Sequence, residues 1–353
     1  MSELQLSLVV IGALVVAGVL AYNRVQERSA QKRADQAFRS AHPDALMGAA
    51  DEGEGRRAVE PAQRAAEVAQ RATDRAADVH DRAVPDRRLD YVMELRAQTA
   101  VPAATVLELW PGLARRFGDR ALLAGSSDDR HWTPVGEGGA TYASLRAALQ
   151  LVSRAGVVGE AELIEFRSEV ENLASRLGLH AASPEMKTAL DEARVLDGFC
   201  AERDIQVALH VVTRDPAGFE RRTLLGLAQR LGLIAGRDGQ LACRDAGDRL
   251  IYVLADRSGA RLDATGPVAA ALLALSLTMD VPRAPDTRRS FEAMARLAGS
   301  IAHELGGTMV DDNGSALDER SLAAIDAQLE AARSELDARG FAPGGPLALR
   351  LFS

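Results

Sequence analysis

The 353-residue sequence predicts an α+β protein with a single N-terminal transmembrane helix, a flexible linker and two tandem split β-α-β domains. Three observations lead to this prediction: an uncharged apolar run, a long alanine-rich segment with balanced charges, and an internal repeat. The predicted boundaries are 1–22 for the anchor, 23–88 for the linker, 89–202 and 203–340 for the two domains, and 341–353 for a C-terminal tail.

The transmembrane prediction rests on Leu4 to Tyr22, which contains no charged residue in 19 positions. As a helix this run would be about 28 Å long, close to the roughly 30 Å hydrocarbon core of a bilayer. The basic residues Arg24, Arg28 and Lys32 follow it, so the positive-inside rule places the N-terminus in the periplasm and the remainder in the cytoplasm. A cleaved signal peptide is the alternative, but no basic region precedes the run.

The linker, residues 23–88, has 13 basic and 12 acidic side chains and almost no apolar helical face. Any helix in it would be solvated and marginal, because helices in water are stabilised mainly by packing an apolar face. As a flexible coil of this length it would span roughly 45 Å. It is therefore expected to act as a tether.

Composition limits the classes of function. Hydrophobic residues make up 47% of the chain and charged residues 26%, so the folded part can build real cores. The net charge of −8 argues against a nucleic-acid partner, which would need a basic surface. Two cysteines, Cys200 and Cys243, exclude a disulfide scaffold and are expected to be small, reduced, buried hydrophobic residues.

The repeat is clearest in two helical stripes 128 residues apart. Leu163, Phe166, Val170, Leu173 and Leu177 correspond to Phe291, Met294, Ala298, Ile301 and Leu305. Upstream, 145–153 and 273–281 align without a gap as strands, and 89–96 corresponds to 205–212 as the first strand of each unit. Each unit then reads β, α, two or three strands, a long helix, a short strand and a closing helix.

Such an order predicts mostly antiparallel sheets with helices on one face, which leaves the other face for water or a partner. Pro111 should break the helical pattern of 104–118. Ser183-Pro184 is expected to begin one closing helix, and Asp318 to cap the other.

No motif predicts catalysis, a metal or a cofactor. His303-Glu304 lacks the second histidine of a zinc-protease motif, since Gly307 stands in its place. The run 311–314 lacks the alternating ligands of a calcium loop and is expected to be a turn. Trp110 and Trp132 are expected to be core or sheet-face residues. The six histidines are scattered, with no pair at metal-ligand spacing.

The stretch from Gly266 to Asp312 resembles the C-terminal domain of the ZipA family of cell-division proteins. The matching features are a strand ending in Val281-Pro282, a helix ending at Gly306-Gly307, and a short strand running into Asp311-Asp312. The resemblance covers 203–340 well and 1–33 by type of segment, and it extends to the first domain only through the repeat. It implies a domain that binds the C-terminal peptide of FtsZ in a shallow apolar groove on an exposed sheet face.

The partner-binding residues that this resemblance implies lie on the first, second, third and fourth strands of the second domain. They are Val207, Leu209, Val211, Leu241, Arg257, Ser276 and Thr278. Thr278 stands where the family pattern has an aromatic ring, which makes the expected groove more polar.

These features together predict a non-catalytic adaptor that tethers FtsZ filaments to the bacterial inner membrane at the division septum. Its expected partners are the FtsZ peptide, the bilayer through the N-terminal helix, and in one hypothesis a second copy of the chain. A second hypothesis is a membrane-anchored scaffold or dimerisation module that binds another envelope or division protein, with one repeat as spacer. A third is an enzyme whose site is not recognisable in the sequence.

Overall fold

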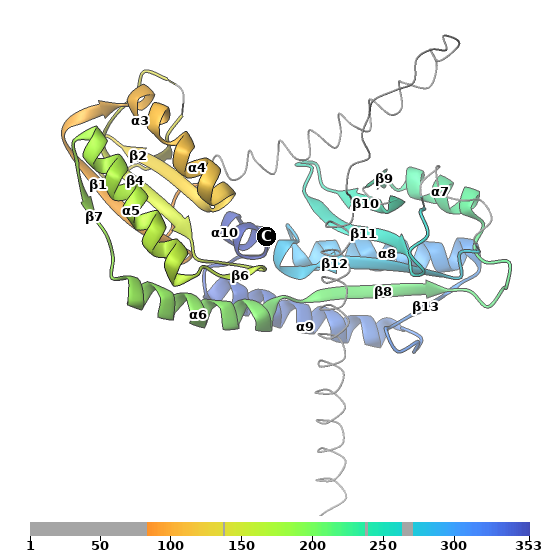
Figure 1. Ribbon diagram of the computed structural model, residues 1–353. Helices are drawn as coiled ribbons and strands as arrows, with labels where there is room; N and C mark the ends of the chain where they lie inside the picture. The colour runs from red at the N-terminus through yellow and green to blue at the C-terminus, as the bar shows by residue number, and fades with distance from the viewer. Residues whose placement is uncertain (1–82, 137, 237–238, 263–270) are drawn as a thin grey trace, which may run out of the picture. The chain divides into compact units, whose positions relative to one another are not determined.

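The computed structural model describes residues 83–353, apart from 137, 237–238 and 263–270 (Figure 1). All of these belong to a single compact unit of the chain. Within these ranges no helix combines the length and the apolar character needed to cross a bilayer. The predicted anchor, 1–22, and the linker as far as residue 82 lie outside the described residues.

The first half of the described chain alternates strands with helices. Its elements are β1 (Asp90–Pro102), α3 (Ala103–Leu109), α4 (Pro111–Phe117), β2 (Ala121–Ser126), β3 (Thr133–Pro134), β4 (Thr141–Gln150), β5 (Val152–Ser153), β6 (Gly156–Val157), α5 (Glu160–Leu177), β7 (Leu179–Ala182) and α6 (Met186–Arg203). We call the part from residue 83 to 203 the first domain.

The second half follows a similar order and ends in an additional short helix. Its elements are β8 (Gln206–Val212), α7 (Arg221–Arg230), β9 (Ile234–Ala235), β10 (Leu241–Arg244), β11 (Leu250–Asp256), β12 (Ala274–Asp280), the 3₁₀ turn η3 (Val281–Arg283), α8 (Thr287–Leu305), β13 (Thr308–Val310), α9 (Glu319–Ala338) and α10 (Pro346–Leu351). We call residues 204–340 the second domain.

The two main sheets share the order of four strands, β7-β1-β4-β2 and β13-β8-β12-β11, and all their pairs are antiparallel. They differ beyond these four, because β3 follows β2 in the chain whereas β10 precedes β11. The first sheet runs β7-β1-β4-β2-β3, and the second runs β13-β8-β12-β11-β10-β9. In each, a short late strand, β7 or β13, flanks the first strand, β1 or β8, which pairs in turn with β4 or β12. This is the mixed arrangement of antiparallel sheets and helices that the sequence predicts.

The strand register corrects the ungapped alignment of 145–153 with 273–281. Leu145 pairs with Leu95, and Leu275 pairs with Val211 at the matching position of the second sheet. The two strands therefore correspond at an offset of 130 residues (275 against 145), while the long helices correspond at 128. The two-residue difference lies in the connection between strand and helix.

Each sheet has its own hydrophobic core on the helix side. In the first domain the core joins alternate residues of β1, such as Met93 and Leu95, to the stripe of α5 that includes Phe166. In the second, Leu209 and Val211 of β8 pack with the α8 stripe. Alternation along the strands sends one set of side chains to each face, and α5 and α8 each cover one face of their sheet.

The helix ends follow local chemistry. Pro111 separates α3 from α4, as predicted, and Asp318 caps α9 through a 2.8 Å hydrogen bond from the Ser321 backbone N–H. The predicted start at Ser183-Pro184 is wrong, because Glu185 is the N-cap of α6. Its carboxylate accepts the backbone N–H groups of Lys187 and Thr188.

The C-terminal segment, expected to be a tail, is part of the first core. Phe341, Ala348, Leu351 and Phe352 are buried among side chains of β1, α5 and α6. The Phe199 and Phe341 rings lie 6.3 Å apart between centroids. The chain therefore returns to the first domain after completing the second.

A buried ion pair holds this return. Arg350 of α10 is 1% exposed and donates two hydrogen bonds to the Asp90 carboxylate at the start of β1. It also donates to Oε1 of Gln150 at 3.1 Å, while Nε2 of Gln150 donates to the Arg350 carbonyl at 2.9 Å. Burial raises the pKa of Asp90, and the charge and hydrogen bonds of Arg350 oppose that rise.

Gly344 makes the turn into α10 possible. Its φ of 67° lies in the left-handed region, and its N–H donates to the Pro282 carbonyl at 2.9 Å. A Cβ at this position would come within 2.5 Å of the Pro285 Cα, so only glycine fits both the conformation and the space.

Replacement of Arg350 by methionine should lower the free energy of unfolding by about 3–5 kcal/mol, because Asp90 would keep a buried, uncompensated charge. The double variant Asp90→Leu/Arg350→Met should recover much of this loss, since it leaves no buried charge. Urea unfolding of the four proteins in this cycle measures both effects. An Arg350→Met protein as stable as the wild type would contradict the structural role of the pair.

Replacement of Gly344 by valine should loosen the C-terminal segment and expose Cys200. The Cys200 Sγ lies 3.9 Å from the Leu351 carbonyl, and burial raises the pKa of this thiol to about 11. In the wild-type protein Cys200 should therefore react with a thiol reagent far more slowly than the half-buried Cys243. Peptide mapping after timed alkylation should show faster labelling of Cys200 in the variant, with Cys243 as the internal reference.

Candidate functional site

The second sheet has one covered and one open face. On the covered face, Leu209, Val211 and Leu277 are 0% exposed beneath α8. The alternate side chains point to the other face and are half-buried. They are Ala208, Ile251, Val253, Ala255, Ser276 and Thr278, and we call this surface the open face.

The matching face of the first sheet is covered. Ala208, Thr278 and Val253 form one row across the second sheet, and its counterpart in the first sheet joins Val92, Ala148 and Leu122. Those three first-sheet side chains are at most 4% exposed and form a small cluster of their own with Ala83.

The segment just before β1 provides this cover together with α10. Besides the packing of Ala83, the Arg87 guanidinium donates to Glu94 on the same face of β1 at 2.9 Å. Arg350 covers the neighbouring row through Asp90. Residues 83–88, predicted as the end of the linker, are therefore part of the folded unit.

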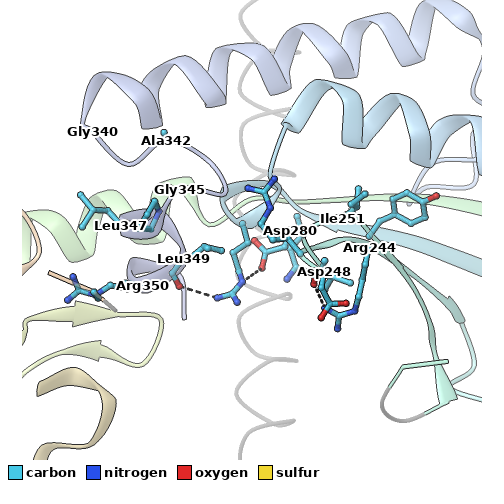
Figure 2. A pocket seen from close by; sticks show the side chains of 18 of the residues that line it. Arg244, Asp248, Ile251, Asp280, Gly340, Ala342, Gly345, Leu347, Leu349 and Arg350 are labelled. Atoms are coloured by element: carbon cyan, nitrogen blue, oxygen red, sulfur yellow. Dashed lines mark hydrogen bonds and ion pairs between the residues drawn. The ribbon is translucent and has the colours of Figure 1, made fainter. Parts of the chain in front are cut away.

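A groove of about 1200 Å³ lies along the open face (Figure 2). Its sheet side includes Arg244 of β10, Ile251 and Val253 of β11, and Thr278 of β12. The opposite side consists of residues 340–350, among them Ala342, Leu347 and Leu349, and Asp86 and Arg88 also line it. Figure 2 shows Leu347 and Leu349 on one side and Ile251 and Arg244 on the other.

Ion pairs fix the polar side chains at the edge of the groove. Arg154 bridges Asp280 and Asp204, with nitrogen–oxygen distances of 2.8 and 2.5 Å. Burial favours a lower pKa for Arg154, but the hydrogen bonds to both aspartates outweigh it and raise the pKa. Arg283 contrasts with it, because burial lowers its pKa. Its Nη1 donates to the Phe352 carbonyl at 2.8 Å and the Leu349 carbonyl at 3.3 Å.

At the other edge of the open face, His210 is removed from solvent. Its side chain is 5% exposed, and Nε2 lies 2.8 Å from the Asp312 carboxylate. The loop after β13 folds back through a bridge between Val310 and Ala316. The available part of the face therefore lies toward β10, β11 and β12.

The predicted site residues fall on different surfaces. Ser276 and Thr278 lie on the open face, as expected, with their hydroxyl oxygens 3.4 Å apart. Arg257 is exposed just after β11. Val207, Leu209, Val211 and Leu241 pack in or against the core on the covered face. Their assignment to the exposed face is therefore wrong, because the helices cover that set of alternating side chains.

Arg244, Ile251, Val253 and the C-terminal segment also line the groove, although no sequence pattern predicts them as site residues. Along β11 both alternating sets are apolar, with Ile251 and Val253 on one face and Tyr252 and Leu254 on the other. Alternation therefore could not separate the open face from the core. The apolar run in 346–352, interrupted by one arginine, was the available signal that the C-terminus is buried.

The residues that were compared with metal-binding motifs, and Trp132, make local contacts within the fold. His303 is exposed, and Glu304 pairs with Arg230 at 2.6 Å. The Asp311 carboxylate accepts backbone N–H groups of Asn313 and Ser315, so this run is a turn, as predicted. Trp132 stacks on Arg146 at 3.9 Å. Among the described residues, no group of three or more His, Cys, Asp or Glu side chains has an arrangement that could hold a metal.

The second domain is an α+β unit whose antiparallel sheet has helices on one face and a groove on the other, and a comparison with known families bears on it. Residues 206–328 match the family described as ZipA, C-terminal FtsZ-binding domain. The match runs from the first residue of β8 into α9 and spans about a third of the chain. No curated protein matches the sequence. Residues 206–328 are therefore similar to the ZipA C-terminal domain.

Alanine substitutions should distinguish the two faces. Leu209→Ala should lower the free energy of unfolding by about 2–5 kcal/mol, because it leaves a cavity in the core. Thr278→Ala should change it by less than about 1 kcal/mol, since the side chain is half-buried on the open face. Equal losses in urea unfolding would contradict the assignment of the faces.

Proposed function

We propose that this chain is a non-catalytic, membrane-anchored adaptor whose second domain binds the C-terminal peptide of FtsZ on its open sheet face. The match of 206–328 to the ZipA FtsZ-binding domain carries the proposal. The groove beside Val253 and Thr278 supports the place of binding, because it lies on a half-buried apolar surface of the sheet, on the face opposite α8.

The first domain, in this proposal, originated by duplication of the second and no longer binds peptide. The shared order of four strands, β7-β1-β4-β2 and β13-β8-β12-β11, supports the common origin. Its row of Val92, Ala148 and Leu122 is already buried by the chain itself, so a peptide would have to displace Ala83 and its neighbours. The domain would instead act as a spacer that also holds the C-terminal segment.

Membrane attachment is the second part of the proposal. The uncharged run from Leu4 to Tyr22, followed by basic residues, supports a single-pass anchor in the inner membrane with the domains in the cytoplasm. The 23–82 segment would let the domains reach FtsZ filaments below the bilayer.

Such tethering would depend on avidity. A shallow groove offers limited buried area, which must offset the ordering of the peptide, so each contact should be weak. A filament displays many tails and a membrane many anchors, which raises the effective concentration for every contact after the first.

Substitution of Val253 by aspartate should weaken peptide binding about tenfold or more, because a charge would enter the apolar floor of the groove. The full chain in nanodiscs can be titrated against a labelled C-terminal peptide of FtsZ by fluorescence anisotropy. Leu231→Asp is the matched control, since Leu231 is 46% exposed and lies outside the groove. Failure of the wild-type chain to bind the peptide at high concentration would refute the proposed function.

Avidity predicts that FtsZ polymer binds vesicles carrying the full chain much more tightly than the isolated peptide binds one molecule. Co-sedimentation at several surface densities of the anchored chain should show binding that increases steeply with density. Equal affinity in the two formats would contradict the tethering argument. Vesicles with Val253→Asp provide the control for recruitment that does not use the groove.

A further inference from the structure

The groove on the open face has a second wall that comes from the C-terminus of the chain. Ala342, Leu347 and Leu349 line it opposite β10 and β11. This wall lies beyond residue 328, where the family match ends. The groove has a volume of about 1200 Å³, which exceeds the roughly 300–1,000 Å³ of ordinary small-molecule sites. A groove of this size can hold several side chains of a peptide.

The second wall is attached at both ends of α10. At its start, the Gly344 N–H donates to the Pro282 carbonyl at 2.9 Å. At its end, the Phe352 carbonyl accepts from Arg283 at 2.8 Å, and Arg350 is held by Asp90 in the first core. Because these contacts within the chain hold the wall in place, a peptide would not have to order it on binding, which reduces the entropic cost.

The charge of the groove favours a ligand with a carboxylate. Five arginines and three aspartates line it, on a chain whose net charge is −8. The arginines are Arg88, Arg244, Arg249, Arg283 and Arg350.

Four of these arginines are already engaged. Arg88 pairs with Asp86, Arg249 with Asp245 and Arg350 with Asp90, while Arg283 donates to carbonyls of the C-terminal segment.

Arg244 differs from these four arginines, within the described part of the chain, in the partners of its guanidinium. Its Nη1 donates to the Asp248 backbone carbonyl at 2.8 Å, and no described carboxylate lies within salt-bridge distance of its guanidinium. Arginine can hold a carboxylate through paired charge-assisted hydrogen bonds. The free end of a C-terminal peptide supplies such a group.

We propose that residues 340–350 form the second wall of the peptide site, so that the bound peptide lies between β11 and α10. Its apolar side chains contact Val253 on the floor and Leu349 on the wall, and its terminal carboxylate pairs with Arg244. This inference rests on the proposed function and adds to it a specificity-determining segment outside the family domain.

The test compares floor, wall and control variants of the full chain with the same labelled peptide. Leu349→Asp should weaken binding about tenfold or more, as Val253→Asp does, because both place a charge against the same apolar ligand. Ala342→Trp should also weaken it by filling the groove, since Ala342 is exposed and outside both cores. Leu231→Asp should bind like the wild type.

A second arm tests the carboxylate. Amidation of the peptide C-terminus should weaken binding to the wild type about tenfold or more. This is the loss of affinity expected when a charge-assisted hydrogen bond is removed. With Arg244→Gln, free and amidated peptides should bind equally. Loss of the amidation effect only in this variant would support the pairing, whereas an amidated peptide that binds the wild type as well as the free one would overturn it.

The outcomes separate the inference from the proposed function. If Val253→Asp loses binding while Leu349→Asp and Ala342→Trp keep it, the second wall is wrong and the proposed function stands. If the wild type does not bind, the proposed function itself fails. Slow labelling of Cys200 shows that α10 remains docked in each variant, and Ala342→Trp decides the result if Leu349→Asp releases the helix.

Discussion

The buried pair between Arg350 and Asp90 links residues 260 positions apart and constrains much of the described structure. A charge removed from water needs a partner, so the guanidinium can be buried only where Asp90 and Gln150 receive it. The chain must therefore return from the end of α9 to the start of β1. This return adds α10 to the core of the first domain and places it beside the groove of the second domain.

The contrast between the two sheets follows from the segments that pack over each one. Four strands of each sheet have the same order, and matching rows occupy the same face. In the first sheet the chain's own segments bury that row, whereas in the second the row of Ala208, Thr278 and Val253 is half-buried. Similar folds can therefore carry different functions, because the accessible surface depends on what packs over the sheet.

Local patterns predicted the elements but not the use of their faces. The α8 stripe from Phe291 to Ile301, the break at Pro111 and the cap at Asp318 all follow from spacing and backbone chemistry. The assignment of Val211 to an exposed groove failed because alternation identifies two sets of side chains without showing which set the helices cover. The sequence pattern did not predict Ile251 and Val253 as groove residues, because both faces of β11 are apolar.

The sequence by itself determined the α+β class, the order of the strands and helices, the amphipathic stripes and the resemblance of the second domain to the ZipA family. These depend on neighbouring residues, whose spacing sets periodicity and capping. Only the tertiary structure decided which sheet face is open, where residues 340–350 lie and which arginines are already paired. Those properties depend on contacts between residues far apart in the chain, and no local pattern records them.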